Sequence, residues 1–276
     1  VVEDRDSILS STKAIAERHH DGDMIHVVVA PCSPFSVTTE LMVESAELAR
    51  ELGLRLHTHL CETPEEQQHC LERFGRRPVE MLDEWGWVGS DVWLAHGIHI
   101  DDAEMKVLGS AGTGVAHCPS SNARIAAGMC RVTDLIKAGI PVGLGVDGVA
   151  SNEVGGLFPE LRQALYTARL REMRPDALMP EEVLKIATQG GSQCLGMYNS
   201  GSLEIGQNAD IAVWPGSDLE DIRNPIDGLI LGPDRRAKHV LVKGNLIVKD
   251  GQVLGTDLAK AHQDLAKHAR RIWKHD

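Results

Sequence analysis

The sequence predicts an α/β protein in which strands alternate with helices, followed by a smaller β-rich region and a last helix. Five short apolar runs carry this prediction, at residues 26–30, 54–60, 92–95, 114–117 and 140–146. The stretches between them place apolar residues at helical spacing. Strands that alternate with helices pair in parallel, because each crossover helix returns the chain to the same edge of the sheet. Beyond residue 200 apolar and polar residues alternate instead, which is typical of antiparallel hairpins.

The helices are marked by their ends. Thr63-Pro64-Glu65-Glu66 predicts a helix start with an N-cap Thr, a Pro in the first position and a capping-box Glu. Asp101-Asp102-Ala103-Glu104 predicts a second start by the same logic. Gly53, Gly75 and Gly86 are expected to end helices. Further helices are expected at residues 7–18, 39–52, before Gly139, at 159–171 and at 181–195.

The region after residue 200 predicts hairpins at 201–214 and 237–255, with a tight turn at Lys249-Asp250-Gly251-Gln252. A charged amphipathic helix is expected from 257 to 274. We therefore divide the chain into 1–200, 201–256 and 257–276. Five strands cannot close an eight-stranded barrel, so the sheet is open or the chain is the later part of a longer protein. The absence of an initiator Met and the start inside a helix favour the second interpretation.

The composition is ordinary for a globular protein, with 42% hydrophobic and 25% charged residues in 276. A net charge of −12 offers no basic field to a nucleic-acid backbone, so we expect no nucleic-acid partner. No run reaches the roughly eighteen apolar residues of a membrane span, and Val1-Val2-Glu3-Asp4 does not resemble a signal peptide. The six cysteines form no CxxC pair, which favours reduced thiols and a cytoplasmic location.

Polar residues follow several of the expected strands. His57-Thr58-His59-Leu60-Cys61-Glu62 ends one strand, and both histidines point to the same face because strand side chains alternate. His96, His117 and Asp147 follow three others. Each His alone is as well explained as a hydrogen-bonded core residue, and Glu62 as a helix cap. A carboxylate at Asp147 needs a metal or a histidine nearby, because burying it without a partner costs several kcal/mol.

Four motifs together resemble the amidohydrolase superfamily, in its cytosine/guanine-deaminase-like and triazine-hydrolase branch. They are His59-Leu60-Cys61-Glu62, Leu94-Ala95-His96-Gly97, His117-Cys118-Pro119-Ser120-Ser121-Asn122 and Gly145-Val146-Asp147-Gly148-Val149-Ala150-Ser151-Asn152. The resemblance covers residues 30 to about 216. It implies a (β/α)8 TIM barrel, of which residues 1–200 would hold the later strands, plus a small β-sandwich domain to which residues 201–256 would belong.

The resemblance also implies roles. His59 and Asp147 would be metal ligands, His96 would orient the attacking water, and Glu62 would move a proton to the substrate ring and help to expel ammonia. Asp147 would also accept the proton of that water. Cys32 and Asn122 are further candidate substrate contacts, beside Glu62 and His96; the alternative for Cys32 is a small buried residue. The cofactor would be one divalent metal, zinc or alternatively iron.

Two departures qualify this assignment. The superfamily takes two more metal histidines from an HxH motif on its first strand, and His57-Thr58-His59 matches the fifth strand instead, since Glu62 follows it. The loop Ala30-Pro31-Cys32-Ser33-Pro34-Phe35 lacks the His of adenosine-type enzymes and resembles 8-oxoguanine deaminases. We therefore expect an aminohydrolase that converts a heterocyclic amine such as 8-oxoguanine to its oxo product, urate, with release of ammonia. A homo-oligomer is compatible with the sequence, which leaves the oligomeric state open.

Other interpretations stay open. A triazine amino- or chlorohydrolase and a guanine- or adenosine-type deaminase share much of the pattern, and a non-enzymatic binding protein could use the same barrel. Gly143-Leu144-Gly145-Val146-Asp147-Gly148 matches the dinucleotide-binding GxGxxG motif. Asp147 would then direct its negative charge at a pyrophosphate, which disfavours that site. The zinc deaminases with HxE and PCxxC are not matched, because Pro31-Cys32-Ser33-Pro34 does not supply the second motif.

Overall fold

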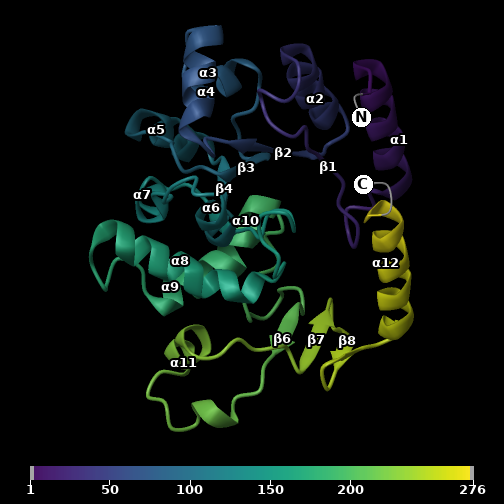
Figure 1. Ribbon diagram of the computed structural model, residues 1–276, viewed down its shortest axis with the longest axis vertical. Helices are drawn as coiled ribbons and strands as arrows, with labels where there is room; N and C mark the ends of the chain where they lie inside the picture. Colours follow the sequence, from purple (N-terminus) through teal and green to yellow (C-terminus); the bar gives the residue numbers. More distant parts are fainter. Residues whose placement is uncertain (1–2, 274–276) are drawn as a thin grey trace.

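The computed structural model describes residues 3–273 and contains two sheets, one parallel and one antiparallel (Figure 1). The parallel sheet has the order β1-β2-β3-β4-β5, so neighbours in sequence are neighbours in space. Its strands are β1 (Val28–Val29), β2 (Arg55–Leu60), β3 (Val92–His96), β4 (Gly114–His117) and β5 (Val142–Leu144). This confirms the predicted α/β fold class. Within residues 3–273 the sheet is open.

Helices precede, connect and follow the strands of the parallel sheet, and several of them pack against it. They are α1 (Arg5–His19), α2 (Thr39–Glu51), α3 (Pro64–Phe74), α4 (Pro78–Glu84), α5 (Asp102–Ala111), α6 (Pro119–Arg124), α7 (Val132–Lys137), α8 (Leu157–Glu172), α9 (Pro180–Lys185), a π-helical turn η1 (Ile186–Gly190) and α10 (Gly191–Leu195). The short helix α6 was not predicted, because Pro-Ser-Ser-Asn reads as a loop in sequence.

The two predicted capping boxes differ in outcome. At α5 the Asp101 carboxylate accepts hydrogen bonds from the N–H groups of Ala103 and Glu104, and Glu104 accepts from the Asp101 N–H. The capping box predicted at Thr63 was wrong. The Thr63 side chain makes no cap hydrogen bond, and Glu66 accepts instead from the N–H of Glu62.

Strand alternation separates a packed face from an open face of the parallel sheet. In β2 the side chains of Leu56, Thr58 and Leu60 are buried, whereas Arg55, His57 and His59 are partly exposed. The buried set packs into a core with Met42, Leu82, Leu94, Leu108 and Leu165, from strands and helices. The helix-packed face therefore holds the apolar core, and the other face is free to carry polar groups.

The antiparallel sheet has the order β6-β7-β8-β9, with β6 (Ile211–Val213), β7 (His239–Val242), β8 (Asn245–Lys249) and β9 (Gln252–Val253). The predicted turn joins β8 to β9 through Asp250 and Gly251, with φ of 49° and 77°. Positive φ at both central residues matches the twist of a two-residue hairpin. The hairpin expected at 201–214 was wrong, because residues 201–210 form no strand and only β6 lies in this range.

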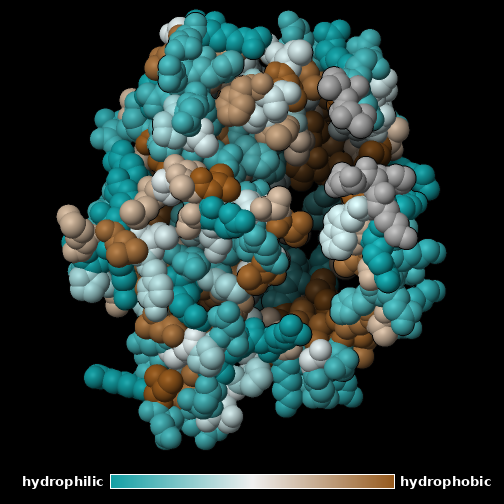
Figure 2. Space-filling view, viewed as in Figure 1, coloured by the Kyte–Doolittle hydropathy of each residue, from teal (hydrophilic) through white to brown (hydrophobic). Residues whose placement is uncertain are grey.

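Three further elements complete the chain, the 3-10 turn η2 (Ser217–Leu219), α11 (Pro225–Leu231) and the terminal α12 (Leu258–Trp273). No described residue of α12 is buried. Figure 2 shows the molecule hollowed between the α/β part and the edge where α12 lies, with apolar residues on the walls. Among residues 3–273, no helix has both the length and the apolar character to cross a membrane. The division of the chain at residues 200 and 256 stays a prediction.

Two adjacent glycines, Gly190 and Gly191, make a matched test of how tightly η1 packs on β5. A Cβ at Gly190 would collide with the carbonyl oxygen of Val142 and lie 2.9 Å from its carbonyl carbon. A Cβ at Gly191 would meet nothing within 4 Å, and its φ of −59° is helical. We expect Gly190→Ala to lower the free energy of unfolding by about 3 kcal/mol, because backbone must move. Gly191→Ala should raise it by about 0.5 kcal/mol. Denaturant unfolding of both variants measures this, and equal stabilities would contradict the packing described.

Candidate active site

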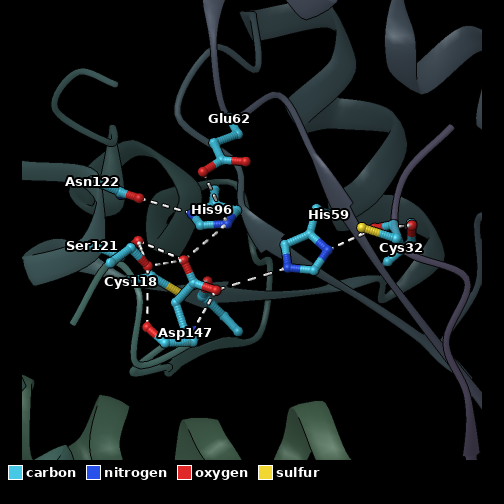
Figure 3. A network of polar contacts seen from close by, with 12 residues as sticks. Cys32, His59, Glu62, His96, Cys118, Ser121, Asn122 and Asp147 are labelled. Atoms are coloured by element: carbon cyan, nitrogen blue, oxygen red, sulfur yellow. Dashed lines mark hydrogen bonds and ion pairs between the residues drawn. The ribbon is translucent and has the colours of Figure 1, made fainter. Parts of the chain in front are cut away.

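Three side chains from separate strand ends converge on the open face of the parallel sheet (Figure 3). His59 comes from β2, His96 from the end of β3, and Asp147 from the segment after β5. His59 Nε2 lies 4.0 Å from Asp147 Oδ1, and His96 Nε2 lies 4.0 Å from Asp147 Oδ2. One ligand atom from each residue lies within 4.8 Å of the others. Two imidazole nitrogens and a carboxylate oxygen form a donor set that suits zinc or another divalent transition metal.

The backbone is unusual at the ends of β2, β3 and β5. His96, Asp147 and Cys61 have φ of 71°, 62° and 53°, in the left-handed region that non-glycine residues seldom adopt. His96 pairs with Leu60, whose side chain is buried in the core. Strand alternation would place the His96 ring on that same side, but the positive φ turns it towards Asp147 instead (Figure 3). Such conformations cost about 1–3 kcal/mol each and concentrate at functional sites.

His59 is held as a metal ligand would be. Its Nδ1 lies 2.6 Å from the carbonyl oxygen of Cys32. A carbonyl can only accept a hydrogen bond, so Nδ1 carries the proton and the Nε2 lone pair faces Asp147. Histidines that bind metals almost always donate their other N–H in this way. The structure thus brings Cys32 to the site through its backbone, while its side chain is exposed.

Asp147 is kept ionised by hydrogen bonds. Its Oδ2 accepts from Ser121 Oγ at 2.5 Å and from Ser151 Oγ at 2.8 Å, and Oδ1 accepts from the N–H of Gly148 at 2.7 Å. Burial alone would raise the pKa of this carboxyl, but the bonds from Ser121, Ser151 and Gly148 outweigh it and leave the pKa below its ordinary value. An ionised carboxylate can both bind a cation and accept a proton.

Glu62 completes the cluster from the start of the βα loop. Its Oε1 lies 3.5 Å from His96 Nε2, and its side chain is 26% exposed, so it can reach both the site and solvent. The Glu62 N–H donates to Glu66 Oε2 at 2.8 Å. Glu66 is itself 3% exposed, and burial raises its pKa to about 7. The sequence predicts Glu66 only as a helix cap, because no local pattern signals its burial beside Glu62.

Glu66→Gln tests this buried carboxyl through the pH dependence of stability. The pKa of Glu66 is about 7 in the folded protein and near 4.5 when unfolded, so the folded state binds more protons between these pH values. Stability therefore falls as pH rises from 4.5 to 7. A shift of this size corresponds to about 3 kcal/mol, which the neutral amide would not lose. We expect the free energy of unfolding of the variant, relative to that of the wild type, to rise by this amount between pH 4 and 8, as measured by denaturant unfolding.

The control is Glu65→Gln, at an exposed neighbouring position. Parallel curves of stability against pH for Glu66→Gln and the wild type would contradict the burial of Glu66.

The remaining candidates lie behind or beside the cluster. Asn122 is 2% exposed, and its Oδ1 lies 2.8 Å from His96 Nδ1. His57 stacks on Trp93, with ring centroids 4.8 Å apart, and its Nδ1 donates to the Trp93 carbonyl at 3.1 Å. His117 is 1% exposed and lies outside the group of potential metal ligands; burial, aided by His96, lowers its pKa to about 4.

Comparison with known proteins places this geometry in context. The model of the amidohydrolase family matches residues 3–247. The 8-oxoguanine deaminase of Pseudomonas aeruginosa is 46% identical over 266 residues, which cover 94% of this chain and 58% of that protein. Hydroxydechloroatrazine ethylaminohydrolase of Pseudomonas sp. strain ADP is 35% identical to this chain. The match covers 99% of this chain and 57% of that protein.

Solved structures of related enzymes share this fold. An adenosine deaminase from Xanthomonas campestris with bound zinc superimposes with a TM-score of 0.93 at 27% identity, covering 98% of this chain and 62% of that one. The chain thus spans about three fifths of the length of these relatives. Because the family model covers most of residues 3–273 and the four motifs meet in one site, the chain belongs to the amidohydrolase family.

Proposed function

We propose that this chain belongs to a metal-dependent aminohydrolase that converts 8-oxoguanine to urate with release of ammonia. The observation that carries the proposal is the convergence of Glu62, His96 and Asp147 from three strand ends, with His96 Nε2 lying 3.5 Å from Glu62 Oε1 and 4.0 Å from Asp147 Oδ2. The 46% identity to an 8-oxoguanine deaminase supports the choice of substrate. Hydrolysis replaces the exocyclic amino group of the ring by oxygen from water, so one water is consumed and one ammonia leaves.

His59 and Asp147 would hold the metal, and His96 Nε2 is close enough to join them or to face the attacking water. The cluster fits a divalent cation because its nitrogens and carboxylate oxygen converge, and because His59 already donates its Nδ1–H to a carbonyl. When bound, such a metal lowers the pKa of coordinated water to about 7. By resemblance, two more histidines would come from an HxH motif outside this chain. The metal would be zinc, as in the similar adenosine deaminase structure, or iron.

The chain's own residues would move the protons. Asp147, ionised, accepts the proton of the attacking water at a carboxylate oxygen. Glu62, partly exposed, donates one proton to the ring nitrogen, which makes the adjacent carbon electrophilic. The proton that Asp147 took from water then goes to the departing amine, and Glu62 helps to expel ammonia by taking the proton of the added hydroxyl as the carbonyl forms. His96 lies between these two carboxylates and orients the water. Cys32 stays a candidate substrate contact, whereas Asn122 is 2% exposed and contacts His96. Six unpaired cysteines support a cytoplasmic enzyme.

A triazine aminohydrolase is the second candidate, because hydroxydechloroatrazine ethylaminohydrolase is 35% identical over nearly the whole chain. Both candidates use hydrolysis at an aromatic carbon that carries nitrogen, so the same cluster serves either. They differ in the leaving group, ammonia from a purine or an alkylamine from a triazine ring.

The test is a screen of the zinc-loaded and iron-loaded full-length protein against 8-oxoguanine, guanine, isocytosine, adenosine and hydroxylated triazines. We expect ammonia and urate from 8-oxoguanine, with the highest kcat/KM of the set. Release of alkylamine from a triazine with no turnover of purines would replace the proposal by the second candidate. A metal-loaded protein that binds these rings without hydrolysing any would instead indicate a binding protein on the same scaffold.

A further inference from the structure

Among the residues that the structure describes, the Asn122 side chain makes one hydrogen bond, which is to His96. Asn122 lies on α6 and is 2% exposed, and His96 is fully buried. The Asn122 Oδ1 to His96 Nδ1 distance is 2.8 Å (Figure 3). A side chain this enclosed is poorly placed to touch a substrate directly, and its contact is with the back of the His96 ring.

This bond determines which nitrogen of His96 carries a proton. An amide oxygen can only accept, so Nδ1 must be the donor. In the neutral ring the Nε2 lone pair then faces Glu62 Oε1 at 3.5 Å and Asp147 Oδ2 at 4.0 Å. Within residues 3–273, Nε2 is buried and has no hydrogen-bond partner. The atom directed into the site is therefore the one able to accept a proton or bind a cation.

The segment that carries Asn122 is itself anchored. The backbone N–H of Asn122 donates to the Cys118 carbonyl at 2.9 Å, and the Asn122 carbonyl accepts from the Ala127 N–H at 2.9 Å. One residue earlier, Ser121 Oγ binds Asp147. One earlier again, the Ser120 N–H donates to Glu160, a buried carboxylate on α8. Two adjacent residues of α6 thus form hydrogen bonds to His96 and Asp147, and a third bonds α6 to α8.

We propose that Asn122 is a positioning residue that keeps His96 in its Nδ1–H form, so that Nε2 faces the metal and substrate. The proposal rests on the proposed function only for the consequence in catalysis. The proton position on His96 is a property of the folded protein and can be measured without substrate. This role differs from a direct contact of Asn122 with substrate.

The first experiment is long-range ¹H–¹⁵N NMR of the zinc-loaded full-length protein with ¹⁵N-labelled histidine. The His96 signals are assigned by their loss in His96→Gln. We expect a protonated Nδ1 and an unprotonated Nε2 in the wild type. In Asn122→Ala that preference should be lost, whereas Asn122→Asp, which keeps an acceptor oxygen, should retain it. A wild-type spectrum with the proton on Nε2 alone, or an unchanged spectrum in Asn122→Ala, overturns the proposal.

The second experiment compares kinetics at equal metal content. We expect Asn122→Ala to lower kcat by about 10- to 100-fold, with KM changed by less than about 3-fold, and Asn122→Asp to recover part of kcat. A large rise in KM with kcat retained would assign Asn122 to substrate binding and overturn the positioning role. Asn245→Leu, at an exposed position on β8, is the control and should match the wild type. Absence of ammonia release from the wild type would contradict the proposed function, while the NMR result still decides the role of Asn122.

Discussion

Replacing Asp147 by Asn in the full-length protein is expected to lower kcat/KM by at least about 10³-fold and to weaken metal binding. The amide keeps the shape of the side chain but loses the negative charge that would bind a cation and accept a proton. Its nitrogen would also face the hydroxyl protons of Ser121 and Ser151, which now donate to the carboxylate. Metal content by elemental analysis and ammonia release from 8-oxoguanine measure the two effects.

Asp176→Asn is the matched control, because Asp176 is exposed and forms a surface ion pair with Arg174. It should leave both metal content and kcat/KM unchanged. An Asp147→Asn protein with full metal content and full activity would remove Asp147 from both roles. Full metal content with lost activity would limit it to proton transfer.

Replacing Glu62 by Gln is expected to lower kcat by about 10²- to 10⁴-fold, with metal content retained. Glu62 lies beside His96 but outside the group of three potential metal ligands, so its loss should remove proton transfer alone. Because the amide cannot release a proton to the ring nitrogen, the chemical step should become rate-limiting. Steady-state kinetics of the metal-loaded variant, together with elemental analysis, measure this.

Glu65→Gln is the control for this substitution, since Glu65 lies three residues away and is exposed. It should behave as the wild type. A Glu62→Gln protein that loses its metal would place Glu62 in metal binding instead. One that keeps its kcat would leave proton delivery to another group.

The strand and helix order could be predicted because it depends on local signals. Apolar runs, glycines and the cap at Asp101 predicted five parallel strands and the helices between them. The failures were also local. Thr63 makes no cap because Glu66 turns to the Glu62 N–H, and residues 201–210 alternate in hydropathy without a partner strand to pair with.

The candidate site was predicted as residue types at strand ends. Parallel strands end at one edge, so His59, His96 and Asp147 could be expected to meet. The distances between these side chains could not be predicted, because they depend on positive φ at His96 and Asp147, which the hydropathy pattern of the strands does not indicate. The hydrogen bond from Glu62 to Glu66 joins residues 4 apart, and the bond from His96 to Asn122 joins residues 26 apart. Their effect on protonation depends on the core that encloses these side chains.

The sequence by itself determined the fold class and which side chains stand at the mouths of β2, β3 and β5, since hydrophobic periodicity and motif order are properties of the chain. Only the tertiary structure decided how these groups act together. It turned the His96 ring away from the core, surrounded Asp147 with hydroxyl donors and placed Asn122 behind His96. The physical reason is that protonation and ligand geometry depend on burial and hydrogen-bond partners, which exist only once distant segments pack.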